Sequence, residues 1–333
     1  MKKFFFSILA VGAIAACTKS EVQYEDAASQ ISFAPVASVA TKANVRGAID
    51  GTTYPANESF YVWAYWQDVA AGNDNSAFTD AKTYINGQEF KYASGNLWQG
   101  RYQSYYWPKT GSLIFAALSP VDAPIDLGTA TVSSKHSLAD NKFCFNYSNP
   151  YETNKTVDLL WANNTLSYSE ATGKDGVPVK FNHALTWITF RVQGQTVAQD
   201  GGFEINSLTL NSVNTYGQFN SFGNGAWGEL GTAKDYVVFN GSQNLTGALV
   251  DLENSPKGTL VIPQTKADGN YTATLVYTND LGDTPIVETI NLNLGSGWEM
   301  GKHYIYNITF TPNEILLVPE VAEWIVEETT FPF

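Results

Sequence analysis

Short apolar segments with a two-residue alternation recur along this chain, and they constrain its fold more than any other feature. In the segment from Tyr271 to Tyr277, apolar residues alternate with threonines and one valine. Alternation of this kind is typical of an antiparallel strand with one buried face. The sequence shows no amphipathic helix longer than two turns. We therefore predict an all-β protein.

Comparable segments recur at intervals of roughly ten residues, separated by Gly, Asn and Asp, which is typical of β-sandwiches. One sandwich has about 100 residues, so the chain after Arg46 is long enough for two. We predict two tandem antiparallel β-sandwich domains, 47–195 and 196–333, and a hairpin turn at Asn86-Gly87. The expected strand segments are 60–66, 84–92, 102–108, 113–118, 158–162, 177–192, 203–213, 236–239, 259–262, 271–277, 285–294 and 303–310.

The first seventeen residues have the features of an exported protein. Two lysines follow Met1, residues 4–16 are almost entirely apolar, and two alanines precede Cys17. A basic start, an apolar stretch and a small-residue exit are typical of a secretory signal peptide. We expect residues 1–16 to be removed and Cys17 to be acylated as in a bacterial lipoprotein, with chains such as palmitate that hold the protein on a membrane. The alternative is an ordinary signal with an incidental cysteine.

The charge balance excludes several classes of partner. Lys and Arg total 19 and Asp and Glu total 32, a formal net charge of −13. Nucleic acids and anionic lipid surfaces favour clustered cations, so neither is expected as a partner. With 2 Cys, one of them Cys17, and 3 His far apart in the sequence, we expect no disulfide, no metal site and no cofactor. Common catalytic motifs are missing, and Gly223–Gly228 fits a glycine-rich turn better than a nucleotide site. We therefore expect no enzyme.

Two terminal segments stand apart from this pattern. Residues 18–30 are small and polar, as in a tether, and 31–39 form a weak alternating segment. Residues 41–47 carry basic side chains and a glycine, and they are expected to form a loop, where proteases cut most readily. The tail from Pro312 to Glu327 is apolar and acidic and is interrupted by Pro319. A strand this apolar needs a groove, which the same molecule or a neighbour can supply.

Several short motifs follow one another along most of the chain. They are Cys17-Thr18-Lys19, Ile31-Ser32-Phe33, Thr41-Lys42-Ala43, Phe60-Tyr61-Val62-Trp63-Ala64-Tyr65, Tyr106-Trp107-Pro108, Phe181-Asn182-His183-Ala184-Leu185, Trp298-Glu299-Met300-Gly301-Lys302-His303-Tyr304-Ile305-Tyr306 and Pro319-Glu320-Val321-Ala322-Glu323-Trp324. In their order and spacing they resemble the fimbrillin (Mfa-like) family of Bacteroidales lipoproteins, the subunits of type V pili.

The resemblance implies transthyretin-like sandwiches and assembly by donor-strand exchange. In such pilins an arginine- or lysine-specific protease cuts the loop after the first strand, and a neighbour's tail fills the groove that this strand leaves. Carried onto this sequence, the cut falls between Arg46 and Gly47, with Lys42 as the fallback. Residues 17–46 then hold the tether and a removable strand within Ile31–Ala40. The implied donor residues, within Asn313–Glu327, are Ile315, Leu317, Val321, Ala322, Trp324 and Val326.

The resemblance also implies where the protein works and with what. It implies a structural subunit for cell adhesion, located first in the outer membrane as a lipoprotein and then in a fimbrium on the cell surface. The implied partners are other pilin subunits in a homo- or heteropolymer, the outer membrane before processing, and a host protein or glycan.

Two alternatives remain open. Without a cut the protein would be a non-polymerising surface lipoprotein, an anchor or tip subunit. Exposed aromatic side chains could also bind glycans, although alternating aromatics in strands are more often core. Consecutive rings point to both faces of a strand, so at least one ring is expected to be exposed. The aromatic clusters are Trp63, Tyr65 and Trp66, and Tyr102, Tyr105, Tyr106 and Trp107; His183, His303 and Cys144 are expected to be structural.

Overall fold

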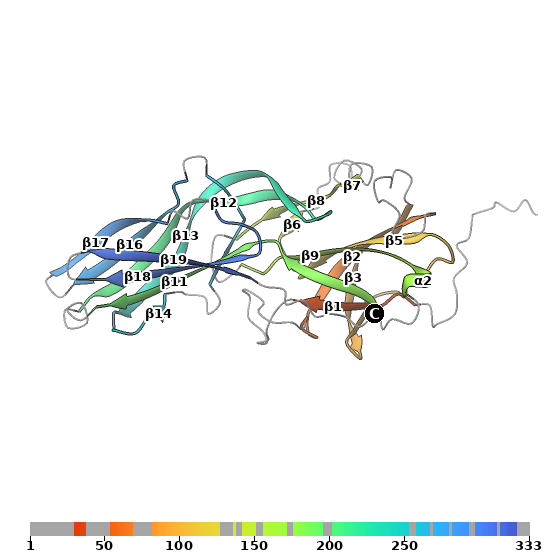
Figure 1. Ribbon diagram of the computed structural model, residues 1–333, viewed down its shortest axis with the longest axis horizontal. Helices are drawn as coiled ribbons and strands as arrows, with labels where there is room; N and C mark the ends of the chain where they lie inside the picture. Colours follow the sequence, from red (N-terminus) through yellow and green to blue (C-terminus); the bar gives the residue numbers. More distant parts are fainter. Residues whose placement is uncertain are drawn as a thin grey trace, which may run out of the picture.

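Strands make up most of the computed structural model, which is elongated and has one group of strands at each end, so the all-β prediction is confirmed (Figure 1). Within the described ranges the only helix is the single turn α2, Tyr168–Ala171. The structure describes residues 30–37, 54–68, 82–126, 136–137, 142–150, 156–171, 176–195, 202–252, 258–266, 269–279, 282–292, 297–311 and 314–324.

The first sheet closes on itself and lies at the right of Figure 1. Its strands follow the order β1-β10-β9-β5-β2-β3-β4, and β4 meets β1 again. All neighbours pair antiparallel except β1 and β10, which are parallel. The strands are β1 Phe33–Ala37, β2 Ser59–Gln67, β3 Lys82–Ser94, β4 Leu97–Gly100, β5 Ser112–Ser119, β9 Leu160–Ser167 and β10 Val177–His183.

Aromatic rings fill the inside of this first sheet. Phe33, Phe60, Phe90 and Phe115 are buried there with Tyr54. Their rings meet mainly edge to face, the geometry that aromatic pairs prefer. The high aromatic content of the sequence is thus used to pack a closed sheet.

The other two sheets pack face to face and form a sandwich at the left of Figure 1. One has the order β14-β11-β18-β19, with β15 also on β11, and the other has the order β17-β16-β12-β8-β6, with β13 on β12 and β7 on β8. Their shared core draws on β11, β12, β16 and β18. The strands are β6 Ile125–Asp126, β7 His136–Ser137, β8 Lys142–Ser148, β11 Thr186–Gly194, β12 Glu204–Asn220, β13 Ala226–Asn244, β14 Val250–Asp251, β15 Thr259–Val261, β16 Thr272–Asn279, β17 Gly282–Asn291, β18 Lys302–Phe310 and β19 Ile315–Glu323.

A third cluster of buried side chains joins the two halves, and we call it the junction cluster. It contains residues of the first sheet, such as Trp63 and Trp161, residues of β8 and β12, such as Phe145 and Phe219, and Trp324, the residue that follows β19. The two halves therefore share a packed apolar contact rather than only a linker.

The chain leaves the first sheet for the last time at Ala184-Leu185, between β10 and β11. The limits predicted from sequence, 47–195 and 196–333, do not follow the sheets. Strand β11 pairs with β18, and β6 and β8 lie with β12 although they precede β9 in the chain. Alternation marks a strand but not the strand it pairs with. As domain limits the two ranges stay a prediction.

The predicted hairpin turn at Asn86-Gly87 is wrong. Both residues lie inside β3, where its register with β2 shifts, and the turn between β3 and β4 is at Gly95-Asn96, with φ of 58° and 60°. Packing accounts for Gly87, because a Cβ on it would lie 3.1 Å from atoms of the Trp63 indole. The glycine accommodates a tryptophan and a bulge, not a chain reversal.

We predict that Phe33→Ala lowers the free energy of unfolding by about 3–5 kcal/mol, the usual cost of removing a buried phenylalanine ring. Phe33 is fully buried against Phe60, Phe90 and Phe115. The measurement is guanidinium unfolding followed by tryptophan fluorescence. The matched control is Ser32→Ala, one residue earlier and half-buried, which should change little. A loss below about 1 kcal/mol for Phe33→Ala would contradict this packing.

Candidate functional site

Strand β1 is the piece that closes the first sheet, and its two contacts are unequal. It pairs with β10 over five residues, from Phe33 opposite Val177 to Ala37 opposite Phe181, but with β4 only at Phe33 opposite Trp98. Its start is held by backbone hydrogen bonds: Ile31 N–H donates to the Tyr105 carbonyl and Val177 N–H to the Ser32 carbonyl, both at 2.7 Å. The seam of the sheet thus depends on one short segment.

The side chains of this segment alternate strictly between core and surface. Ile31, Phe33 and Pro35 are buried, and Ser32 and Ala34 are half-buried. The Phe33 ring centroid lies 5.9, 4.8 and 5.3 Å from those of Phe60, Phe90 and Phe115. Removing the segment would therefore leave an apolar groove between β10 and β4.

Gly176, just before β10, lets the backbone of β1 approach closely. A Cβ there would lie 3.2 Å from both Ala34 N and the Phe33 carbonyl carbon, and 2.8 Å from Leu97 Cδ2. Its φ of +106° is also a conformation that other residues rarely adopt. The sequence analysis missed this residue; its signal was a glycine directly before an apolar strand.

Tyr54 fixes the chain that follows β1. Its ring stacks on Phe181, with centroids 5.1 Å apart, and its hydroxyl lies 2.7 Å from Ser119 Oγ and donates to the Ser59 carbonyl. Burial raises the pKa of the Tyr54 hydroxyl far above its ordinary value, so it stays protonated. The residues predicted for cleavage, Arg46 and Gly47, lie outside the described residues, as does Cys17.

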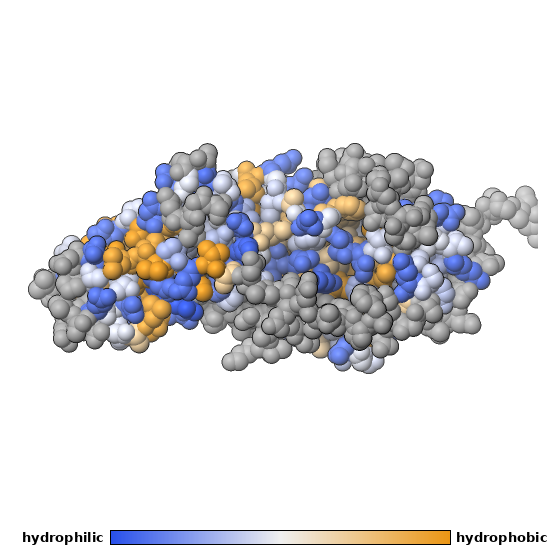
Figure 2. Space-filling view, viewed as in Figure 1, coloured by the Kyte–Doolittle hydropathy of each residue, from blue (hydrophilic) through white to orange (hydrophobic). Residues whose placement is uncertain are grey.

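Strand β19 forms an edge of the second half. It pairs antiparallel with β18 over nine residues, from Ile315 opposite Phe310 to Glu323 opposite Lys302, and has no strand on its other side within the described part of the chain. Leu316, Val318 and Val321 are 39, 55 and 54 % exposed. Figure 2 shows apolar residues gathered over this part of the surface. A long edge strand with exposed apolar side chains is a site ready for another strand.

The sequence left open whether the tail lies in its own molecule or in a neighbour, and in this structure it lies in its own. Ile315 and Leu317 pack on the core of the sandwich, whereas Val321 and Ala322 are exposed. Trp324 is buried, and Val326 lies outside the described residues. Which of the six takes part in assembly stays a prediction.

Trp324 fastens the end of β19 to the junction cluster. Its ring stacks on His183 at 3.7 Å between centroids and lies 5.6 Å from Trp187. The backbone N–H of Trp324 donates to the Gly301 carbonyl. His183 Nδ1 in turn lies 3.0 Å from the Asp158 carboxylate, and both side chains are buried. His183 thus holds the tail through a stacked ring.

His303 also has a structural environment. Its ring stacks on Trp187 at 3.7 Å, and Nε2 lies 2.6 Å from Thr189 Oγ1. Burial, helped by the positive charge of Arg191 and opposed by Asp251, lowers the pKa of His303 from 6.5 to about 4. The imidazole is therefore neutral at physiological pH.

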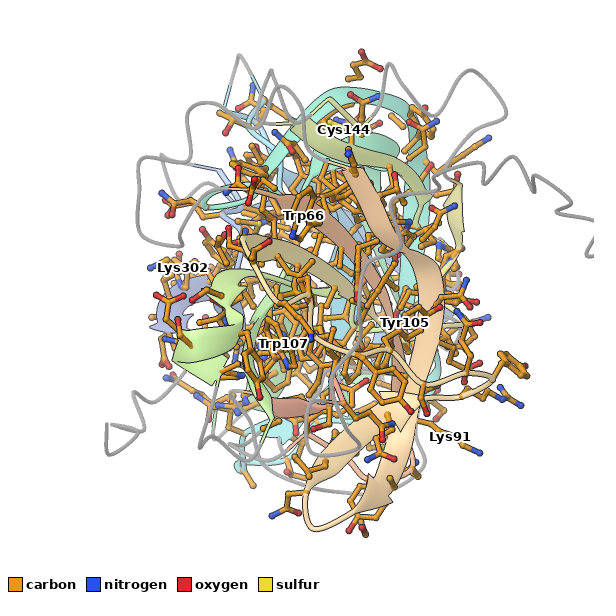
Figure 3. The ribbon with its side chains drawn as sticks, turned by 90° about the vertical axis from the view of Figure 1, so that its right-hand side faces the viewer. Trp66, Lys91, Tyr105, Trp107, Cys144 and Lys302 are labelled. Carbon is orange, nitrogen blue, oxygen red and sulfur yellow. The ribbon has the colours of Figure 1, made fainter. Side chains whose placement is uncertain are left out.

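Three of the seven rings of the aromatic clusters are buried, and Trp66 and Tyr105 are half-buried against the core. Trp63, Tyr65 and Trp107 are buried, whereas Tyr102 is 76 % exposed and lies under the Arg101 guanidinium. Tyr105 is half-buried at the start of β1, and Figure 3 shows it with Trp107 toward the middle of the first sheet. The cluster thus offers one prominent exposed ring, not a platform.

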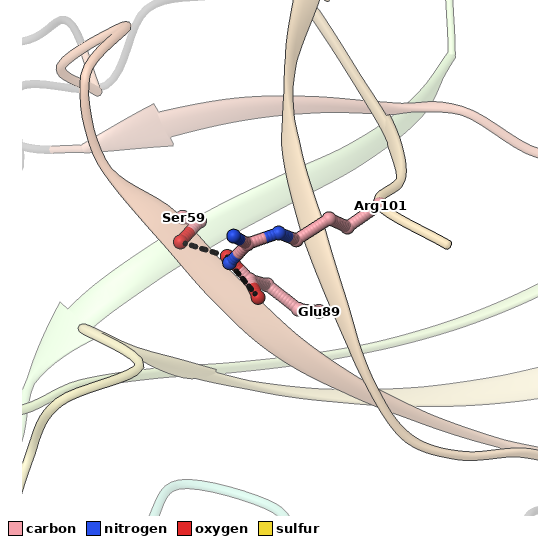
Figure 4. Close-up of polar contacts among 3 residues, drawn as sticks. All are labelled: Ser59, Glu89 and Arg101. Carbon is pink, nitrogen blue, oxygen red and sulfur yellow. Dashed lines mark hydrogen bonds and ion pairs between the residues drawn. The ribbon is translucent and has the colours of Figure 1, made fainter. Parts of the chain in front are cut away.

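An ion pair fastens the loop that carries Tyr102 and Tyr105. Arg101 Nη1 donates to both Glu89 oxygens, at 2.9 and 2.7 Å, and Ser59 Oγ donates to Oε1 (Figure 4). Because Tyr105 accepts the Ile31 N–H, this network also supports the position where β1 begins.

Neither a metal cluster nor a membrane-spanning helix is found in the part of the chain that the structure describes. Among the residues that the structure describes, no three His, Cys, Asp or Glu side chains are grouped as a metal site would need. None of the described helices is long and apolar enough to cross a membrane. Cys144 is buried in β8.

Comparison with known families decides what kind of protein this is. The model of the fimbrillin-like family matches residues 41–324. The chain belongs to the fimbrillin-like family. This is a family of structural fimbrial proteins, not of enzymes, and membership places the chain among proteins of cell-surface fimbriae that assemble with other fimbrial proteins.

Two solved structures have the same fold, and a third is similar to a lesser degree. A fimbrial protein from Bacteroides vulgatus is similar with a TM-score of 0.59 and 15 % identity, covering 89 % of this chain and 99 % of that one. A candidate cell adhesion protein from Bacteroides uniformis gives 0.52 and 16 %, covering 90 % and 100 %. The tip fimbrial protein Mfa3 from Porphyromonas gingivalis gives 0.42 and 11 %, covering 89 % and 100 %. No curated protein matches the sequence.

We predict that protonation of His303 destabilises this fimbrillin-like protein. Its pKa is lower in the fold than in the unfolded chain, so the unfolded chain binds the proton more tightly. The contribution of neutral His303 to the free energy of unfolding is complete above about pH 6.5 and is lost as the pH falls toward 4.

His303→Phe, which keeps a ring on Trp187, should remove this part of the pH dependence. The pH dependence is measured from the free energies of unfolding of the parent and of His303→Phe between pH 7.5 and 4.5. An NMR titration of the parent follows the protonation of His303 directly. An imidazole that titrates at its ordinary pKa would contradict the prediction.

Proposed function

We propose that this chain is a structural subunit of a type V surface fimbria, assembled by protease-triggered donor-strand exchange and serving cell adhesion. The observation that carries the proposal is the seam of the first sheet. A short strand, β1, fills a buried apolar slot there and is held to β4 by a single residue pair. Family membership supports the fimbrial part of the proposal.

Loss of β1 would leave a site in the first sheet that another strand can fill favourably. The edge of β10 would expose unpaired N–H and C=O groups beside an apolar trough. A strand from another subunit would restore the ladder through its backbone and fill the trough with every second side chain, which is strand addition to a sheet edge. Each large apolar side chain buried in this way contributes about 1.5–3 kcal/mol.

One cut at Arg46 would release two constraints together. Cys17 and β1 both precede Arg46, so the same cut frees the subunit from its lipid and frees β1 from the body of the protein. Tyr54, packed against Phe181 and Ser119, would keep the new amino-terminal segment attached to the first sheet. The loop needs only to be accessible to a protease.

The tail is the proposed donor. Leaving its own sheet costs β19 its pairs with β18 and costs Trp324 its buried place on His183. A strand in a neighbour's groove recovers both ladder and apolar burial. Each subunit then gives one strand and receives one, a head-to-tail contact that does not close a ring and so grows a filament.

We predict that an arginine-specific protease cuts residues 18–333 between Arg46 and Gly47 and that the product forms a ladder on an unboiled SDS gel. The reason is that the cut vacates the groove for a neighbour's tail. Amino-terminal sequencing identifies the cut, and deletion of 313–333 should abolish the ladder without affecting the cut.

Two variants control this experiment. Arg46→Ala should prevent both cleavage and the ladder. Arg191→Lys should be cut and should assemble like the parent, because Arg191 lies on β11, outside the first sheet, where its guanidinium pairs with Asp251. A protein that is cut at Arg46 and stays monomeric would contradict the proposal.

We further predict that Cys17→Ser abolishes incorporation of radioactive palmitate and retention in the outer membrane when the full chain is expressed in a bacterial host. The acyl chains on Cys17 are the proposed anchor. Cys144→Ser is the control, since Cys144 is buried in the folded protein, and it should be labelled like the parent. Equal labelling of Cys17→Ser and parent would contradict lipidation.

A second candidate function is a non-polymerising surface lipoprotein, an anchor or tip subunit that binds a host protein or glycan. The observation in its favour is that the tail is already seated in its own molecule, with Trp324 buried. Exposed Tyr102 beside Arg101 is the residue through which a sugar ring would stack. This candidate does not need residues 313–333 for its activity.

A further inference from the structure

We propose that the tail enters the groove of a second copy in one register, with Ile315 in the place of Ile31, Leu317 in that of Phe33 and Pro319 in that of Pro35. The inference rests on the proposed strand exchange. It starts from a match between the two strands: Ile31-Ser32-Phe33-Ala34-Pro35 and Ile315-Leu316-Leu317-Val318-Pro319 share isoleucine, a large apolar residue and proline at alternate positions.

The groove accepts only certain side chains at these positions. The places of Ile31 and Phe33 are fully buried, and the place of Pro35 is buried as well. An isoleucine in the first place keeps the native side chain. A leucine in the second is smaller than phenylalanine but apolar, so it enters without a clash. The tail already has the required alternation, because Ile315 and Leu317 face the core in its present sheet.

The two prolines support the proposed register. In a parallel pair one strand bonds to its neighbour through alternate residues. The bond from Val177 N–H to the Ser32 carbonyl assigns the even residues of β1 to β10. Pro35 therefore points its nitrogen away from β10, and it has no partner on β4. Pro319 fits this position because proline has no N–H to donate.

Other registers of the same segment conflict with the groove. A shift by one residue places the carboxylate of Glu320 in the buried position of Pro35, which is costly without a partner. A shift by two that puts Leu317 at position 31, or a reversed strand with Val321 there, places Pro319 among the three rings that contact Phe33. The opposite shift by two puts the amide of Asn313 in the fully buried place of Ile31. A reversed strand with Pro319 at position 31 loses the hydrogen bond that Ile31 N–H makes to Tyr105.

A second apolar window in the tail, Ala322, Trp324 and Val326, fits less well. It would place Trp324 where the Phe33 ring lies 4.8 Å from Phe90, and a larger ring in a packed core forces neighbouring side chains aside. Alanine would also underfill the place of Ile31.

The two windows make different predictions at Lys180, an exposed residue of β10 that lies opposite Val36. In the proposed register Glu320 lies opposite Lys180. In the second window Glu327 lies there instead. Residues 320 and 327 are on the order of 20 Å apart along an extended strand, so only one of them can be within disulfide reach of position 180.

The test compares Lys180→Cys with Glu320→Cys against Lys180→Cys with Glu327→Cys, both with Cys144→Ala, in residues 18–333. Each protein is cut with the arginine-specific protease, allowed to assemble and oxidised with copper–phenanthroline. Each is then run on SDS gels unboiled, and boiled without reductant. We expect a ladder that survives boiling for the 320 pair, that collapses with dithiothreitol, and that is about ten-fold weaker for the 327 pair.

The other outcomes separate the register from the proposed function. A boiling-resistant ladder for the 327 pair alone would overturn the register but support strand exchange. An unboiled ladder without covalent product in either pair would also overturn the register. Cleavage with no ladder of either kind would overturn the proposed function itself. Lys180→Cys alone, with Cys144→Ala, should give an unboiled ladder only.

Discussion

The burial of one phenylalanine at the seam of the first sheet is the contact on which this structure depends. Phe33 comes from a strand of five residues, yet three aromatic rings of three other strands converge on it. Its strand also makes the only parallel pair in the described part of this sheet. The segment that completes the core is thus joined to the rest of the first sheet through residues 38–53, which include Arg46 and lie outside the described residues.

The other end of the chain has the opposite character. Strand β19 is paired with β18 on one side and, within the described ranges, has no strand on the other. It is apolar on both faces at Leu316 and Leu317. Its end is held by Trp324 on His183, across the junction of the two halves. In the proposed assembly this contact adds to the free-energy cost of releasing the tail, because the tail must leave His183 before it can bind a neighbour. The proposal requires the emptied groove, where the places of Ile31 and Phe33 are fully buried, to outweigh the half-buried places of Ile315 and Leu317 beside β18.

The sequence predicted the class of the fold because alternation is a local property. The segment around Tyr271–Tyr277 became β16 with every second residue buried. Prediction from local sequence failed where a contact with a distant side chain determines the structure. At Asn86-Gly87 a hairpin turn was predicted, but Gly87 is needed because Trp63 occupies the space that a Cβ would take. The pairing of β8 with β12 could not be predicted either, because the sequence of a strand does not specify which strand it pairs with.

In the candidate site, too, local features could be predicted from the sequence and contacts between distant residues could not. Its apolar tail was visible in the sequence, whereas the loop expected at residues 41–47 lies outside the described residues and stays a prediction. The role of Gly176 was not visible, because it exists only once β1 lies against this residue. The stack of Trp324 on His183 joins residues far apart in the chain, and a lone histidine in a strand gives no sign of it.

The central claim is that a neighbour's strand replaces β1. A cryo-electron microscopy map of the filament formed after cleavage tests it most directly, at a resolution that shows side chains between β10 and β4. The account predicts density there for a tail strand that continues into the adjacent subunit, with no residue before Gly47. Density for Ile31 and Phe33 in that groove would contradict it.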